Sequence, residues 1–228
     1  MSLLVDAWDF YRENRGLVDR AFWEHVRLTA VALGLATATG VALGIAAAKL
    51  GRGAAFAVVA IGNLGRTVPT FAVMALALTL ASVGFWPAAI GLYALAVPPI
   101  LLNTFTGIRE VDAGAVEAAR GMGLTPAQIL ARVELPIALP LVSAGIRTAS
   151  VEVVATAALA GLVGAGGLGA VVISGLQTGQ DDVLLAGAIP IALLALAAQV
   201  LFGVAERLVT PRGLRIGRGL ATHEGRTT

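Results

Sequence analysis

The sequence predicts an all-α integral membrane protein with about five transmembrane helices. Hydrophobic residues make up 57% of the 228 residues and charged residues only 13%, about half the charged fraction of an average soluble domain. Several stretches carry no charge at all, and each is long enough for the about 20 apolar residues that cross a bilayer. They comprise residues 28–48, 67–108, 153–180 and 183–205. A soluble bundle would not need uncharged runs of this length, so we expect a polytopic membrane protein.

The expected spans follow the apolar runs in order: 28–48, 54–82, 86–107, 136–163 and 183–206. The second contains Arg66 and Pro69, and proline interrupts helical hydrogen bonding, so we expect a kink or a break there. If this span is instead two short segments, the count becomes six. In the first span, Gly40 and Gly44 form a GxxxG pattern, which allows a neighbouring helix to approach closely.

The chain divides into three parts. Residues 1–25 mix acids, arginines and aromatics without the apolar run of a signal peptide. We expect them to form an amphipathic segment on the membrane surface, with a solvated tail as the alternative. Residues 26–208 form the transmembrane domain, which includes a long connecting segment at 110–136. Residues 209–228 are expected to be a cytoplasmic tail.

The positions of lysine and arginine predict the orientation. Basic residues follow the first, third and last spans, whereas the loops near 83–86 and 170–182 contain none. By the positive-inside rule, the connecting segment and the C-terminus face the cytoplasm of a cell-membrane protein. Five spans then place the N-terminus outside. Four arginines near the N-terminus oppose this orientation, although five acidic residues accompany them: Arg12, Arg15, Arg20 and Arg27 against Asp6, Asp9, Glu13, Asp19 and Glu24.

The connecting segment contains the signals for two short helices. Asp112 is a favourable N-cap for a first helix that runs to about Arg120. Gly121 and Gly123 are expected to end it, because glycine accepts the left-handed conformation at a helix end.

A second helix is predicted to follow directly. Thr125 is its N-cap, Pro126 takes its first position and Gln128 completes a capping box. Pro136 then opens the next span. The expected product is a rigid helix–turn–helix on the basic side of the membrane, although capping alone also fits an ordinary connecting loop.

The same segment resembles the EAA signature of ABC importer permeases: Glu-Ala-Ala, three residues, Gly, nine residues, Ile, one residue, Leu-Pro. The matching residues are Glu117, Ala118, Ala119, Gly123, Val133, Leu135 and Pro136, with valine in place of isoleucine at 133 as the one departure. In that family the segment forms a coupling helix seated in a groove of the ATPase. The resemblance implies that Glu117 makes a polar contact with the ATPase, that Ala118 and Ala119 pack closely and that Gly123 supplies the turn.

The resemblance extends over about residues 28 to 205, and it is to permeases for glycine betaine, carnitine and choline. It rests on residues 103–108, 117–123, 133–140, 145–149 and 164–169. It implies a type I ABC importer permease with a methionine-permease-like fold. The implied partners are ABC ATPase subunits, an extracytoplasmic solute-binding protein and a second permease chain, identical or paralogous. Methionine permeases share the EAA segment and the glycine-rich stretch, so methionine or another amino acid is the alternative cargo.

Candidate pathway residues come from intramembrane charges and from motifs at the ends of spans. A charge inside the membrane normally faces the bundle interior or a water-filled path. Five residues separate Arg147 from Glu152, so the two point about 140° apart on a helix and do not form a simple pair. Arg147 is close enough to the helix start to snorkel. Glu152 either lines the passage, where it would favour a cationic solute, or pairs with another span. The full candidate set is Arg66, Pro69, Asn103, Arg147, Glu152, Gly164, Gly166, Gly167 and Gly169.

Gly164, Gly166 and Gly169 match the dinucleotide-binding pattern GxGxxG. That pattern requires a preceding strand and a βαβ unit, whereas here it ends a membrane helix. We therefore expect a flexible external end of the fourth span, with a role in the outer gate. Replacing Gly166 with valine is then expected to impair uptake without disturbing assembly.

Other activities find no support in the sequence. There is no cysteine, and His25 and His223 lack a second ligand nearby, so no metal site is expected. The only lysine, Lys49, is outside any P-loop, so ATP and Mg²⁺ belong on a partner ATPase and the chain is not expected to be an enzyme. The arginines flank the spans rather than forming a basic stripe, which argues against a nucleic-acid partner. Aromatic residues are too scattered for a cage around a quaternary ammonium, so recognition falls to the binding protein. A small channel or membrane scaffold is the alternative from another class.

Overall fold

The computed structural model describes residues 3–65, 67–80 and 82–209, and within them every regular element is a helix and no strand occurs. The elements are α1 (Leu3–Glu13), α2 (Arg15–Lys49), α3 (Arg52–Gly65), α4 (Thr70–Leu80), α5 (Phe85–Arg109), α6 (Ala113–Gly121), α7 (Pro126–Ile129), the π-helical turn η1 (Leu130–Glu134), α8 (Leu135–Thr156), the 3₁₀ stretch η2 (Ala157–Val163), α9 (Gly167–Thr178) and α10 (Asp181–Val209).

Four helical segments are long and apolar enough to cross a membrane: Arg15–Lys49, Phe85–Arg109, Pro126–Val163 and Asp181–Val209. The predicted break in the second span is confirmed, because α3 and α4 meet at an angle of 94°. At 1.5 Å per residue the two are only ~21 Å and ~17 Å long, so neither crosses a ~30 Å core alone. The pair therefore supplies at most one further span, as a broken helix, so the described residues contain four or up to five spans rather than six.

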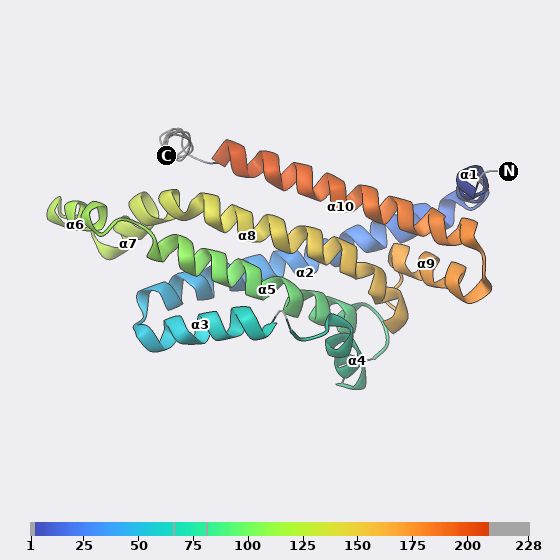
Figure 1. Ribbon diagram of the computed structural model, residues 1–228, viewed down its shortest axis with the longest axis horizontal. Helices are drawn as coiled ribbons and strands as arrows, with labels where there is room; N and C mark the ends of the chain where they lie inside the picture. The colour runs from blue at the N-terminus through green and yellow to red at the C-terminus, as the bar shows by residue number, and fades with distance from the viewer. Residues whose placement is uncertain (1–2, 66, 81, 210–228) are drawn as a thin grey trace, which may run out of the picture.

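Helix α5 forms the centre of the bundle, with α2, α4 and α8 packed around it (Figure 1). Its residues Leu92, Ala96 and Ile100 are fully buried. Glycines on α2 allow the close approach that the GxxxG pattern predicts. A Cβ atom on Gly44 would lie 2.7 Å from Cβ of Thr104 on α5. Small residues hold these two helices together, as is usual inside a membrane.

Two helices extend beyond what the sequence analysis expected. The first span was expected to begin at residue 28, and the helix that contains it, α2, begins earlier, at Arg15. Residues 170–182 were expected to form a loop, but most of them belong to α9. Both extensions exist because they pack on each other: Val18 and Ala21 of α2 share a buried cluster with Leu168 and Val171 of the α9 segment. Within the predicted segment 1–25, the described residues 3–25 thus comprise α1 and the first turns of α2.

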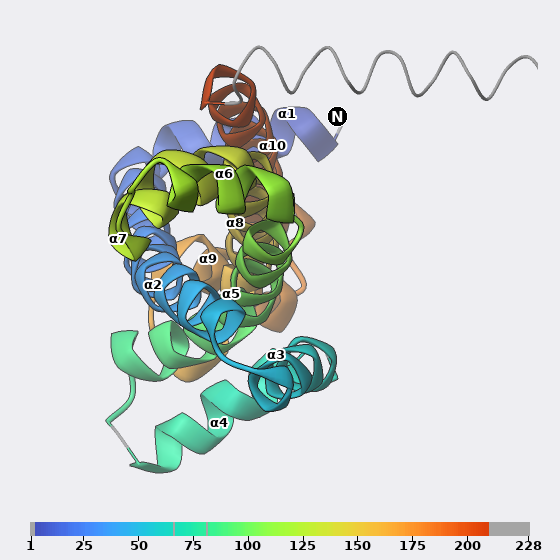
Figure 2. The same ribbon diagram turned by 90° about the vertical axis from the view of Figure 1, so that its left-hand side faces the viewer.

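The bundle has two distinct ends. At one, called here the α6 end, α6 and α7 lie across the ends of α2, α5 and α8 (Figure 2). At the other, the α9 end, α1 and α9 lie beside the start of α2 (Figure 1). The basic residues that follow the spans gather at the α6 end: Lys49, Arg109, Arg120, Arg132 and Arg207. The predicted tail lies outside the described residues after Val209.

Candidate coupling segment and pathway residues

Helix α6 is capped at both ends as the sequence predicts, with one exception. The Asp112 carboxylate accepts the backbone N–H of Ala115 at 2.9 Å. At the other end, the backbone N–H of Leu124 donates to the carbonyl oxygen of Ala119 at 3.2 Å. Gly123 makes this bond possible by adopting φ +84°. Gly121 is the last helical residue and has no positive φ, so only Gly123 supplies the turn.

The predicted second short helix is not a separate element. Thr125 and Gln128 form the expected capping box, through bonds of 2.9 Å and 3.4 Å. The helix that they start, however, continues through α7, η1 and α8 as one segment, Pro126–Val163. Pro136 does not interrupt it, because the preceding turn is wide: the N–H of Leu135 donates to Leu130, five residues back. In this register the proline is accommodated near the start of α8.

The EAA residues divide into an exposed and a packed group. Glu117 and Ala118 are exposed, whereas Ala119 is buried inside this chain. Val133, Leu135 and Pro136 are half-buried at the start of the fourth span. We name the exposed surface of the segment the docking tip; it consists of Glu117, Ala118, Gly121, Met122 and Gly123.

Sequence reasoning missed two residues of this region. Met122 leaves 74% of its surface exposed at the docking tip, and its place between two glycines was the available signal. Glu134, inside the EAA spacing, is only 5% exposed. Its carboxylate accepts a hydrogen bond from Nζ of Lys49 and forms an ion pair with it. Because 85 positions separate the two residues, no sequence spacing could indicate this pair.

The charged candidates in the fourth span have different surroundings. Nη1 of Arg147 lies 3.1 Å from a carboxylate oxygen of Glu206 on α10, so this arginine ties α10 to α8. Glu152 is exposed on α8 in the single chain. That Arg147 and Glu152 do not form a simple pair stays a prediction.

The remaining span candidates lie apart from these. Asn103 on α5 donates to the carbonyl oxygen of Pro99 at 2.8 Å. It also faces α8 closely, because a Cβ on Gly145 would lie 2.8 Å from Cβ of Asn103. Pro69 is exposed just before α4. Arg66 lies outside the described residues.

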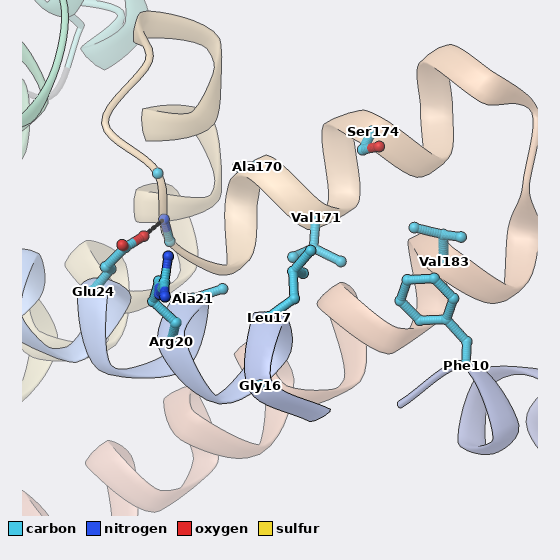
Figure 3. A pocket seen from close by; sticks show the side chains of 12 residues that line it. Phe10, Gly16, Leu17, Arg20, Ala21, Glu24, Ala170, Val171, Ser174 and Val183 are labelled. Atoms are coloured by element: carbon cyan, nitrogen blue, oxygen red, sulfur yellow. Dashed lines mark hydrogen bonds between the residues drawn. The ribbon is translucent and has the colours of Figure 1, made fainter. Parts of the chain in front are cut away.

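The glycine-rich stretch after the fourth span is a packed junction rather than a flexible end. Gly164, Gly166 and Gly167 have φ of +70°, +74° and +72°, which only glycine adopts readily. The N–H of Gly167 donates to the Glu24 carboxylate at 2.9 Å, as Figure 3 shows. Gly169 touches the backbone of η2, since a Cβ there would lie 2.0 Å from the oxygen of Ala158.

This packing also changes the result expected for Gly166→Val, the variant suggested above as a test of an outer gate. A Cβ on Gly166 would lie 2.5 Å from a carboxylate oxygen of Glu24, and the positive φ disfavours any side chain. Replacing Gly166 with valine is therefore expected to disturb folding and cannot isolate a gating role. A pocket of about 460 Å³ lies beside the junction, between α2 and α9, and its lining includes Leu17, Arg20 and Ser174 (Figure 3).

No arrangement of metal ligands occurs among the described residues. His25 lies buried within α2, and its Nε2–H donates to the carbonyl oxygen of Val154 at 3.0 Å. His223 lies outside the described residues.

Comparison with known proteins now decides the family. Residues 40–212 match the family described as binding-protein-dependent transport system inner membrane component. The chain belongs to this family. A similar permease is the carnitine transport permease protein OpuCB of Listeria monocytogenes, 39% identical over 92% of this chain and 95% of that protein. Another is the choline transport system permease protein OpuBB of Bacillus subtilis (strain 168), 36% identical over 90% of this chain and 94% of that protein.

The structure of this permease is also similar to solved ones. An inward-facing MetNI methionine ABC transporter matches it with a TM-score of 0.76 and 26% identity, covering 87% of this chain and 99% of that chain. The predicted methionine-permease-like fold is thereby confirmed. So is the assignment to the ABC importer permeases of the osmoprotectant subfamily. The family is one of transport subunits in the membrane.

Proposed function

We propose that this permease forms half of the translocation pathway of an ATP-driven importer for a quaternary-ammonium osmoprotectant of the glycine betaine, carnitine or choline type. The observation that carries the proposal is the docking tip, an exposed turn held rigid by caps at Asp112, Gly123 and Thr125. Capping alone also fits an ordinary connecting loop, but here the rigid turn presents the EAA residues Glu117 and Ala118 on its exposed surface. Relatives named for carnitine and choline support the substrate class.

The partners follow from this arrangement. An ABC ATPase, carrying ATP and Mg²⁺, binds the docking tip of each permease chain, and a second permease completes the pathway. A binding protein delivers the solute at the α9 end. ATP binding closes the ATPases, draws the two docking tips together and opens the pathway outward. The basic residues at the α6 end support a cytoplasmic position for the docking tip and the C-terminus.

Copurification with the cognate ATPase tests the docking assignment. Glu117→Arg reverses an exposed charge at the centre of the docking tip, and the copurified ATPase is expected to fall about tenfold or more. Glu13→Arg makes the same reversal on an exposed residue at the α9 end and serves as the matched control. Full recovery of ATPase with Glu117→Arg would refute the assignment, and no ATPase with the unmodified chain would favour a channel or scaffold.

Uptake into proteoliposomes tests the cargo. The complete transporter, with its binding protein, is expected to accumulate labelled glycine betaine, carnitine or choline only when ATP is present. Methionine is the competitor to compare, because methionine importers share the fold. Uptake of methionine in preference to all three quaternary ammonium solutes would establish the amino-acid alternative.

Glu152 is the residue proposed to meet the cationic part of the solute, because it is an exposed carboxylate on a spanning helix. Glu152→Gln is expected to lower the uptake rate of a cationic solute about tenfold while ATPase copurification is unchanged. Glu110→Gln, on an exposed residue outside the spans, is the control. An unchanged uptake rate with Glu152→Gln would remove this residue from the pathway.

A further inference from the structure

The only lysine of the chain forms an ion pair with the only buried carboxylate of the coupling segment. We propose that the Lys49–Glu134 pair is a positioning contact that makes the cytoplasmic end of α2 follow the movements of the docking tip. This inference rests on the proposed function, since it needs a tip that an ATPase moves. It assigns to α2 a part in coupling that the EAA resemblance does not contain.

Each partner occupies the end of an element. Lys49 is the last residue of α2, where a cation is favoured by the unpaired carbonyl groups. Glu134 is the last residue of the π turn η1. Such wide turns interrupt the regular helix and often occur at functional positions. The pair thus joins the end of one spanning helix to the irregular turn that begins another.

In the described part of the chain, the Lys49–Glu134 pair is the single polar side-chain contact between α2 and the coupling segment. Among the described residues, no second ion pair or side-chain hydrogen bond joins α2 to residues 112–134. A cavity of about 650 Å³ lies beside the pair, and Val116, Arg120 and Leu124 of the α6 side line it. The α6 side of the coupling segment therefore does not pack fully against α2, and the ion pair is the directional link between α2 and η1, the turn that follows α7.

The Lys49–Glu134 ion pair fixes the relative position of the two elements more than it stabilises the fold. A buried ion pair is often no more stabilising than apolar residues of equal volume, whereas removal of one partner leaves an uncompensated charge. Glu134 is 5% exposed and cannot turn to water, while the Lys49 side chain is 46% exposed and can. Losing Lys49 should therefore destabilise the fold more than losing the charge of Glu134.

A double-mutant cycle in the complete reconstituted transporter separates linkage from stability. The variants are Lys49→Met, Glu134→Gln, both together, and the exchange Lys49→Glu with Glu134→Lys. Three quantities are measured: solute transported per ATP hydrolysed, copurified ATPase and the Tm of the permease. Arg132→Met, on an exposed basic residue of the same turn, is the matched control.

We expect Lys49→Met to lower both the Tm and the transport per ATP. The double variant should regain most of the Tm, because no lone charge is left, but its transport per ATP should stay about tenfold low. The exchanged pair should recover much of that ratio. Copurified ATPase should be normal throughout, since the docking tip is intact.

Two results would overturn the inference. One is normal transport per ATP in the double variant. The other is a transport-per-ATP ratio that falls and recovers only in parallel with the Tm across the variants, because such a result would mean that the contact is merely structural. The proposed function fails by a different result. In that case the unmodified chain itself neither copurifies with an ATPase nor supports ATP-dependent uptake, and the positioning role is overturned with it.

Discussion

The two ends of this permease use glycine and polar groups in opposite ways. At the α9 end, glycines let backbones touch: a Cβ on Gly175 would lie 2.4 Å from the backbone nitrogen of Leu184, and one on Gly161 would lie 2.7 Å from that of Ala170. At the α6 end, Gly121 and Gly123 have no atom within 4 Å of a Cβ position. There, side-chain caps and an ion pair fix the shape. The α9 end is therefore sensitive to added volume, and the α6 end to the loss of directional contacts.

The largest effect is expected at Gly169. Gly169→Ala places a Cβ 2.0 Å from the oxygen of Ala158, so the backbones must separate at a cost of about 3 kcal/mol. Gly34→Ala is the matched control, because nothing lies within 4 Å of its Cβ position and alanine favours a helix. Thermal unfolding of the purified chain in detergent measures both. Equal Tm values would mean that the α9 end is not volume-limited.

The next effect concerns the ion pair between α8 and α10. Arg147→Met removes the ion pair between Arg147 and Glu206 and is expected to cost about 2 kcal/mol. Replacing both residues with methionine should recover part of that loss, because the desolvated carboxylate is removed as well. The same unfolding measurement applies. A double variant less stable than the single one would show that charge is not the source of the effect.

Glu24 tests the charged contact that joins α2 to the glycine-rich junction of the α9 end. Glu24→Ala removes the acceptor of the Gly167 N–H and is expected to cost about 1.5 kcal/mol, as for other hydrogen bonds to charged groups. Hydrogen exchange of the Gly167 amide should accelerate correspondingly. Glu24→Gln keeps an acceptor oxygen and should lose less. If the Gly167 amide exchanged as slowly in both variants as in the unmodified chain, glycine packing alone would fix this junction.

The smallest effect is expected at the cap of α6. Asp112→Ala should make local opening of α6 easier by about 1 kcal/mol and so accelerate exchange of the Ala115 amide, whereas Asp112→Asn, which also caps well, should change little. The sharper result is functional, because a frayed docking tip should bind ATPase less well without any change in the Tm of the bundle. Normal ATPase binding with Asp112→Ala would show that the tip does not need to be rigid.

Hydropathy and capping chemistry could predict much of the molecule. Apolar runs locate the membrane segments, and a proline marks the broken second span between α3 and α4. The caps at Asp112 and Thr125 were predictable because each needs only residues within one helical turn. The EAA spacing was sufficient to identify the family.

What the sequence could not predict depends on contacts between distant residues. Lys49 and Glu134, like Arg147 and Glu206, meet only after the helices pack. Helix α9 was expected to be a loop because it is short and lies between glycines, although it is stabilised by α2 and α10. The start of α2 was missed for the same reason: it is stabilised by packing against α9, and its many charged residues hide the apolar pattern of its one buried face.

Helix α2 is much longer than one membrane crossing requires. Its 35 residues make a rod of about 52 Å, which is some 20 Å longer than the hydrocarbon core that it crosses. Lys49 is at one end of this rod, and Glu24, which bonds to the α9 junction, lies more than halfway to the other. Tilting a rod of that length by about 10° about one end displaces the other by ~9 Å. The long helix thus has the dimensions of a lever, through which a small rotation at the α6 end changes the position of the α9 end by several ångströms.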